Sequence, residues 1–222
     1  MKAAWSYLRS TIGSKHLVGV TGLGLSLFVL VHMAGNMLIF LGPKAYNMYS
    51  HALISNPFIY VAEAGLVALF LLHLGKATQL QLKNWGARSR YAVAASGPKK
   101  TTSTQKTLWA QGSILLVFVI LHLNTFKYGP TYTVTYGGQE VRDLFQLVVE
   151  VFQSPAYVVG YVFALLVLGF HLSHGVGSTF QTLGLHHPRY QHSIKMVSWV
   201  YAIVVAAGFI SQPIYVYLVH EA

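Results

Sequence analysis

The chain has 222 residues, of which 54% are hydrophobic and only 9% are charged. Because soluble domains usually carry about a quarter charged residues, this composition excludes a soluble globular protein and indicates an integral membrane protein. The absence of cysteine excludes disulfides, cysteine-bound zinc, iron–sulfur clusters held by this chain and thioether-attached haem. The formal charge of +10 is carried by residues that flank long apolar runs, so it indicates membrane topology rather than nucleic-acid binding.

Five stretches have the roughly 20 apolar residues that a membrane-spanning helix needs. In chain order they cover residues 17–41, 57–79, 107–127, 155–181 and 196–219. The first follows basic residues, as in a secretory signal, but its uncharged run is too long and no small-residue cleavage site closes it. We therefore predict an all-α integral membrane protein with five transmembrane helices in a single domain, residues 1–222.

The distribution of charge predicts the orientation. Twelve of the 15 basic residues lie before the first stretch, at or between the facing ends of the second and third, or between the fourth and fifth. Lys44, Lys127 and Arg142 lie on the opposite side, and all five acidic residues fall on that side or in its half of the membrane. Since basic residues are retained in the cytoplasm, we expect a cytoplasmic N-terminus and a C-terminus outside.

The connecting segments differ in character. Residues 83–106 form a polar, basic hairpin loop between the second and third stretches. Residues 131–136 alternate threonine with tyrosine or valine and are followed by Gly137 and Gly138. Residues 140–153 have amphipathic spacing, which predicts a helix lying on the outer membrane surface.

Four of the 11 histidines lie deep inside predicted spans, one in each of the first four: His32, His73, His122 and His171. Ionisable groups inside a bilayer are costly and tend to be functional. A hydrogen bond to a neighbouring helix explains a single buried histidine equally well. Four histidines in four successive spans require a joint explanation.

The depths of these histidines supply one. At about 1.5 Å per residue, His32 and His122 lie roughly 4–7 Å to the outer side of their span midpoints, and His73 and His171 lie as far to the cytoplasmic side. The two layers are therefore roughly 10–15 Å apart. Two facing imidazoles are the ligands of a six-coordinate b-type haem. We predict a haem-binding bundle, with an outer haem on His32 and His122 and an inner haem on His73 and His171.

Other histidines are weaker candidates. His174 follows His171 by three residues and is the rival ligand in the fourth span. Two ligands on one helix, as in the cytochrome b of respiratory complex III, would need a spacing that only His174 and His187 approach, and Gly184 and Pro188 make that region a loop. A metal site is less favoured than a solvated loop for the cluster of His186, His187 and His192, and an interfacial position accounts for His16, His51 and His220.

Six segments in chain order resemble the five-helix, di-haem cytochrome b anchor subunit of bacterial succinate dehydrogenase and fumarate reductase. They are SKHLVGVTGL, FVLVHMAGNMLIFLGP, SNPFIYVAEAG, LLHLGK, VRDLFQLVVEVFQSP and GFHLSHGVGSTFQTLGLHHP. The resemblance covers about residues 10–217, and FHLSHG and FQTLG are its most specific parts. It implies one axial histidine on each of the first four helices, namely His32, His73, His122 and His171, and it favours His171 over His174.

The resemblance also implies partners and a function. A flavoprotein subunit and an iron–sulfur subunit would dock on the cytoplasmic face of a bacterial cytoplasmic membrane, and electrons would pass between them and a quinone, menaquinone rather than ubiquinone. The chain itself would carry no catalytic residue. Family members with a quinol-binding carboxylate have it between the first two spans, but residues 42–56 contain no acid and Glu63 is the nearest.

Two further sets of residues are candidates for these ligands. The anionic haem propionates need donors or cations, and at the cytoplasmic depth these are Ser14, Lys15, Lys76, Trp109 and Lys195. Snorkelling to the interface explains Lys76 equally well. For a quinone beside the outer haem the candidates are Asn36, Tyr46, His51 and Glu63, with Tyr60 and Asn124 nearby. The alternative is a quinone site at the cytoplasmic interface with the iron–sulfur partner.

Two other functions compete with this prediction. A cytochrome b subunit of a hydrogenase or formate dehydrogenase would also bind two haems, but a flavin-bearing partner would not accompany it. A small proton-coupled transporter could use histidines along its path. Transporters often show internal repeats or broken helices, and neither is evident here.

Overall fold

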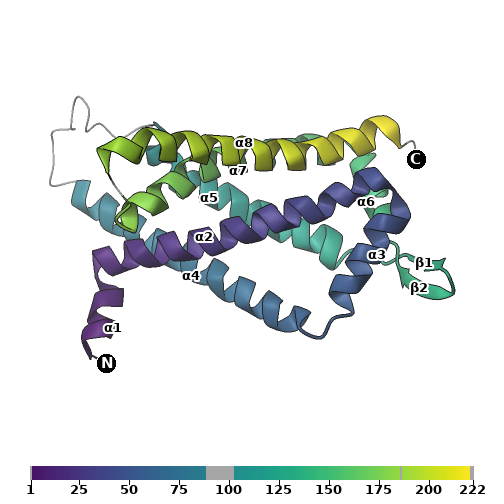
Figure 1. The fold of residues 1–222 in the computed structure, drawn as a ribbon, viewed down its shortest axis with the longest axis horizontal. Helices are drawn as coiled ribbons and strands as arrows, with labels where there is room; N and C mark the ends of the chain where they lie inside the picture. Colours follow the sequence, from purple (N-terminus) through teal and green to yellow (C-terminus); the bar gives the residue numbers. More distant parts are fainter. Residues whose placement is uncertain (1, 89–102, 186, 221–222) are drawn as a thin grey trace.

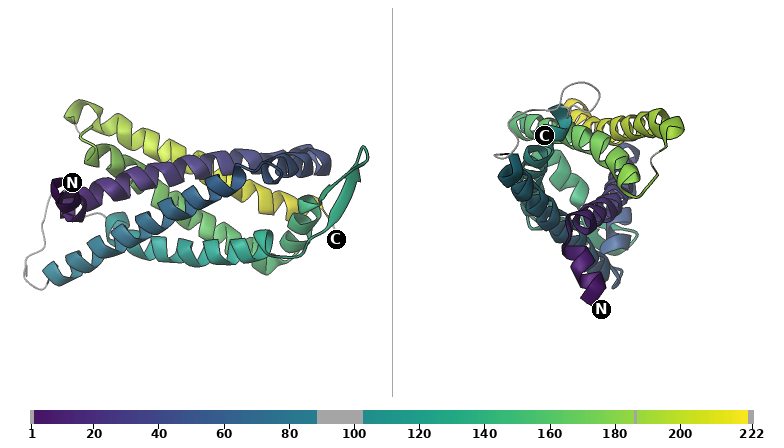
Figure 2. Two further views of the ribbon diagram at one scale, coloured as in Figure 1. Left: turned by 90° about the horizontal axis from the view of Figure 1, so that it is seen from below. Right: turned by 90° about the vertical axis from the view of Figure 1, so that its left-hand side faces the viewer.

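The computed structural model describes residues 2–88, 103–185 and 187–220. Within them, five helices are long and apolar enough to cross a membrane: Thr11–Leu41, Ile59–Ala87, Thr107–Lys127, Pro155–Thr182 and Pro188–Val219. They lie side by side along the long axis of the molecule (Figures 1 and 2). The prediction of a mainly helical protein with five helices long and apolar enough to span a membrane is confirmed.

The elements follow one another closely along the chain. In order they are α1 (Lys2–Arg9), α2 (Thr11–Asn36), the 3₁₀ turn η1 (Met37–Leu41), α3 (Pro43–Ile54), α4 (Ile59–Arg88), α5 (Ser103–His122), the π-helical turn η3 (Leu123–Lys127), β1 (Thr133–Tyr136), β2 (Gln139–Arg142), α6 (Leu144–Phe152), α7 (Pro155–Thr182) and α8 (Pro188–Val219).

Four of the long helices enclose the interior of the bundle. Helix α2 packs against α4 and α7, and α5 packs against α7 and α4, so these four helices form a closed ring. Helix α8 packs on the outside of this ring, against α7 and α2. The four helices of the ring are those that carry the four intramembrane histidines.

Small residues let α8 approach its neighbours closely. A Cβ atom on Gly208 would lie 2.5 Å from the sulfur of Met33, and one on Gly169 would lie 3.1 Å from the Cβ of Ala206. Ala202 and Val205 are almost completely buried in the same seam. Without a hydrophobic driving force between helices in lipid, such close packing is the usual source of helix association.

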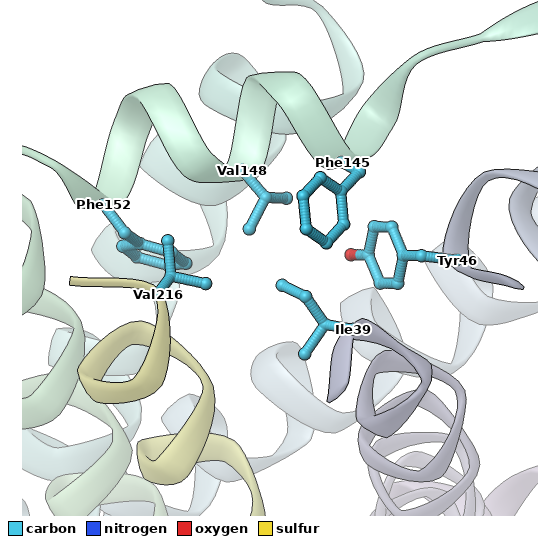
Figure 3. Close-up of a cluster of buried hydrophobic side chains, with 6 residues drawn as sticks. All are labelled: Ile39, Tyr46, Phe145, Val148, Phe152 and Val216. Atoms are coloured by element: carbon cyan, nitrogen blue, oxygen red, sulfur yellow. The ribbon is translucent and has the colours of Figure 1, made fainter. Parts of the chain in front are cut away.

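One end of the bundle, which we call the outer end after its predicted orientation, carries a cap built from α3, α6 and the β1–β2 hairpin. Its apolar core combines Ile39 and Tyr46 with Phe145, Val148 and Phe152 of α6 and Val216 of α8 (Figure 3). The fully buried Asn47 joins the parts of the cap, because its amide donates to Asp143 at 2.8 Å and its oxygen accepts from the backbone of Phe145 at 2.9 Å.

The predicted outer surface helix is partly wrong. Residues 139–142 form β2, which pairs antiparallel with β1, and the helix begins only at Leu144. Gly137 and Gly138 both adopt positive φ angles in the tight hairpin turn between the strands. The Asp143 side chain then caps α6 by accepting from the backbone of Gln146.

Other boundaries also differ from those predicted. The last long helix begins at Pro188 rather than at residue 196, because His187 accepts from the backbone of Arg189 and proline is well suited to the first turn. Residues 42–56 contain α3, and residues 2–9 form α1; neither helix was predicted. Of the basic hairpin predicted at 83–106, residues 89–102 lie outside the described residues, as does His186.

Candidate functional site

The outer histidine pair joins α2 to the end of α5. The rings of His32 and His122 have centroids 5.9 Å apart and planes at 82°. Phe28 stacks on His32, and Phe118 stacks on His122. The pair therefore lies in an aromatic environment between two helices that run in the same direction.

Polar groups contact the Nδ1 atom of each imidazole in the outer pair. The Tyr161 hydroxyl of α7 lies 3.2 Å from His122 Nδ1. On α2, the Asn36 amide nitrogen donates to the His32 carbonyl at 2.8 Å and lies 3.4 Å from His32 Nδ1. The Tyr46 hydroxyl in turn donates to Asn36 Oδ1 at 2.7 Å. Burial raises the pKa of Tyr46, so this hydroxyl remains a donor, and it links the outer cap to His32.

The inner histidine pair joins α4 to α7. The ring centroids of His73 and His171 are 6.5 Å apart, with planes at 75°. His73 Nδ1 lies 3.1 Å from the Val18 carbonyl and 3.2 Å from the Thr21 hydroxyl, both on α2. A backbone carbonyl accepts only from a protonated ring nitrogen, so this contact assigns the proton of His73 to Nδ1 and leaves Nε2 as an acceptor.

Close approach of α2 holds the inner pair in place. A Cβ atom on Gly22 would lie 3.1 Å from Cε1 of His73, so a larger residue there would press on the ring. On the other helix, His171 Nδ1 is buried and has no hydrogen-bond partner among the described residues. The inner pair thus has one imidazole with a fixed tautomer and one with a buried ring nitrogen left unpaired.

The ring-centroid distances of both pairs are compatible with two imidazoles that bind one metal ion. With metal–nitrogen bonds of about 2 Å and a ring radius of about 1 Å, two imidazoles on opposite sides of a metal have centroids about 6 Å apart. The observed 5.9 and 6.5 Å match this value. Ligating histidines usually donate their other ring nitrogen to a carbonyl or similar group, as His73 does to Val18. No group of three or more histidine or acidic side chains suited to a metal occurs among the described residues.

A cavity of about 650 Å³ lies between the four helices of the ring, at the end of the bundle where α2 begins. Its volume lies within the range of roughly 300–1,000 Å³ that is usual for ligand and cofactor sites. Basic and neutral polar residues line it, without an acidic one; they are Lys15 and His16 of α2, Gln81 and Asn84 of α4, and His174, Ser178, Gln181 and Thr182 of α7, together with Ile12 and Leu108. A cavity with this lining favours an anionic group.

The structure places His171 and His174 differently. The ring of His171 faces His73 across the bundle. One turn further along α7, His174 lines the cavity. His16 was interpreted as an interfacial histidine, but it also lines the cavity, where its Nε2 donates to the Thr182 carbonyl at 2.8 Å and its Nδ1 bonds to the Tyr7 hydroxyl.

The five candidates for propionate contacts lie in different places. Lys15 lines the cavity. Lys76 donates to the Leu8 carbonyl at 3.2 Å and to Gln79 at 3.3 Å. Ser14 is fully buried, Trp109 packs edge-to-face on Trp85, and Lys195 is exposed on α8.

The candidates for quinone contacts form three separate groups. Tyr46 of the outer cap donates to Asn36 at the end of α2. His51 Nε2 lies 2.9 Å from the side-chain amide of Gln139 in the hairpin. Glu63 pairs with Lys127 of η3 at 2.5 Å, and both side chains are partly exposed. Tyr60 and Asn124 are exposed.

Several residues that contact the pairs were missed. Thr21 lies on the same face of α2 as His32, eleven residues earlier, so helical periodicity could have indicated it. Tyr161 could not have been found in this way, because its contact with His122 depends on how α5 and α7 pack. The same applies to the lining of the cavity, which comes from four helices.

Comparison with known proteins adds no relative. No protein-family model, curated protein or solved structure matches this chain.

Proposed function

We propose that this chain is a membrane-embedded electron-transfer subunit that holds two b-type haems, one on His32 and His122 and the other on His73 and His171. The observation that carries the proposal is the two imidazole–imidazole contacts, with centroids 5.9 and 6.5 Å apart, inside one ring of membrane-length helices. A b-type haem supplies reversible one-electron redox chemistry.

The residues around each pair have distinct roles in this proposal. Val18 and Thr21 contact Nδ1 of His73, which would leave its Nε2 to hold the haem iron, and Gly22 leaves room for its ring. The Tyr161 hydroxyl contacts Nδ1 of His122, and the Asn36 amide contacts Nδ1 of His32. Because second-shell partners fix the orientation and basicity of a ligand, these residues would tune the two sites separately.

The cavity that begins one helical turn from His171, at His174, supports the same proposal. Lys15, His16 and His174 bring cationic or donor groups to it, and no acidic residue lines it. The carboxylates of the inner haem would accept charge-assisted hydrogen bonds from these groups. This set differs from the one expected from sequence, since it includes His16 and His174.

The partners follow from the sequence resemblance and from the charge distribution. We propose that the chain anchors the flavoprotein and iron–sulfur subunits of a succinate:quinone oxidoreductase, in a bacterial cytoplasmic membrane with the N-terminus inside. The basic residues at the ends of the spans would face those subunits. Electrons would pass through both layers to or from a quinone near the outer pair, where Glu63 or His51 can exchange protons.

A spectroscopic experiment with the assembled complex tests this proposal. The complex is purified from membranes through a tag on this chain, and the absorption spectrum is recorded before and after addition of succinate. We expect a flavin-bearing and an iron–sulfur partner to co-purify, and the haem absorption bands to sharpen on reduction.

Other outcomes would identify a different protein. Haem bands without a flavoprotein partner would indicate the cytochrome b of a hydrogenase or formate dehydrogenase. A purified chain without any haem would contradict the redox function and leave the transporter class.

A further inference from the structure

Helix α1 leaves the bundle at a sharp corner. It turns away from α2 at a steep angle in Figure 1, and in the view along the long axis in Figure 2 it projects beyond the outline of the bundle. It therefore runs across the direction of the membrane-length helices rather than continuing one of them.

The corner is built into the local sequence. Ser10 accepts from the backbone of Gly13 at 3.0 Å and donates to the Tyr7 carbonyl at 2.6 Å, so one hydroxyl caps both helices. A Cβ atom on Gly13 would lie only 2.0 Å from the Tyr7 carbonyl oxygen, which no side chain could tolerate. Only glycine at this position allows α1 to fold across the start of α2.

Two contacts with the bundle hold α1 in this direction. Lys76 of α4 donates to the Leu8 carbonyl at the C-terminal end of α1, where a cation also interacts favourably with the helix dipole. The Tyr7 hydroxyl bonds to His16 of α2. The direction of α1 is therefore fixed by contacts on two helices.

The position of the corner matches the headgroup level of a bilayer. The 31 residues of Thr11–Leu41 form a helix about 46 Å long, close to the roughly 40–45 Å thickness of a bilayer with its headgroups. A helix that leaves the end of this span sideways lies in the plane of the interface.

The side chains of α1 suit that plane. Trp5 and Leu8, three residues apart on one helix face, are exposed, and Trp5 is 65% exposed. The Arg9 guanidinium lies 5.8 Å from the centre of the Trp5 ring. No acidic residue precedes Glu63 in the sequence, so the surface near the corner is cationic. Tryptophan at the interface together with basic residues is typical of helices that lie on anionic membranes.

From this geometry we propose that α1 is a membrane-surface helix that inserts Trp5 and Leu8 into the headgroup region and binds anionic phospholipid. The direction of α1, sideways out of the bundle, favours a lipid surface over a soluble partner docked on the end of the bundle. The proposal depends only on the membrane-spanning fold and not on haem binding.

Site-directed spin labelling tests this proposal directly. Because the chain has no cysteine, Leu8→Cys gives a single label on the apolar face of α1, and Ser6→Cys gives a matched control on the opposite face. The full chain is placed in vesicles of phosphatidylcholine with phosphatidylglycerol. At position 8, we expect oxygen to relax the spin label more than a water-soluble nickel chelate does. At position 6, we expect the nickel chelate to relax the label more than oxygen does.

The other outcomes each contradict part of the proposal. Equal, high nickel accessibility at both positions would show that α1 lies in water and would overturn it. Nickel accessibility that falls only when the soluble subunits are added would identify a protein partner instead. Identical results in vesicles of phosphatidylcholine alone would contradict the preference for anionic lipid.

Discussion

The two ends of the bundle differ in how their interiors are filled. At the outer end, the cap of α3, α6 and the hairpin closes the bundle with a packed apolar cluster and the buried Asn47. At the opposite end, helices α2, α4, α5 and α7 surround a cavity of about 650 Å³ lined by basic and neutral polar groups. The outer end is thus filled by its own side chains, whereas the opposite end contains a cavity with a basic and polar lining.

The two histidine pairs share this asymmetry. The outer pair is surrounded by Phe28, Phe118 and Tyr161 and is linked to the cap through Asn36. His73 of the inner pair is oriented by backbone and hydroxyl groups of α2, and His174, one helical turn from His171, lines the cavity. Substitutions at the two ends should therefore have separable effects.

The largest effect is expected from removing one histidine of each pair. His122→Ala should eliminate the outer haem and leave His73 and His171 with theirs, and His73→Ala should do the converse. Each variant should retain half of the haem of the unmodified chain, with a spectrum that differs between the two. Two intact haems in either variant would contradict the pairing.

The next effect concerns the stability of the outer cap. Asn47→Ala removes hydrogen bonds to Asp143 and to the backbone of Phe145 in a fully buried position. Leaving these groups unpaired should lower the free energy of unfolding by about 2–4 kcal/mol, measured by thermal denaturation in detergent. The exposed Asn124→Ala is the matched control and should have little effect, and an equal loss in both variants would refute a structural role for Asn47.

A smaller and local effect is expected at the cavity. Lys15→Met removes a cation from the cavity, which His174 also lines one helical turn from His171. Since a nearby positive charge stabilises the reduced state, its loss should lower the midpoint potential of the inner haem; an interaction of about 1 kcal/mol corresponds to about 40 mV for one electron. Redox titration measures this shift, and the outer haem should keep its potential.

The exposed lysine on α8 provides the control for this titration. Lys195→Met also removes one positive charge, but from the outside of the bundle. A shift as large in Lys195→Met as in Lys15→Met would show that net charge, not the cavity, sets the potential.

The smallest effect on stability is expected for Glu63→Gln. Its ion pair with Lys127 is partly exposed, and such pairs contribute about 0–1 kcal/mol. If the carboxylate exchanges protons with a quinone, quinone reduction should slow while both haems stay intact. His51→Ala is tested alongside it, and full activity in both variants would place the quinone site elsewhere.

The sequence predicts the parts of this fold that depend on hydropathy and helical rise. The five apolar runs correspond to the five long helices, and the structure brings together the histidines at matching depths, His32 with His122 and His73 with His171. The boundaries were less accurate, because they depend on caps such as His187 before Pro188. Local hydrogen bonds end or start a helix where hydropathy changes little.

The cap and the cavity could not be predicted from the sequence. Helix α3 packs on α6 and on β2, and its Asn47 accepts from the backbone of Phe145 in α6, so these elements depend on contacts between distant segments. The cavity lining comes from four helices, so single-helix patterns carry no signal for it. His16 illustrates this limit, since its position near the end of a span gave no indication of its contact with Thr182.

The ratio of haem to protein in the purified chain tests the central claim most directly. Haem is extracted and quantified as its pyridine complex, and the protein is quantified by amino-acid analysis of the same sample. Two facing histidine pairs predict two non-covalently bound haems per chain. A ratio of zero would contradict haem binding, and a ratio of one would contradict the assignment of both pairs as ligands.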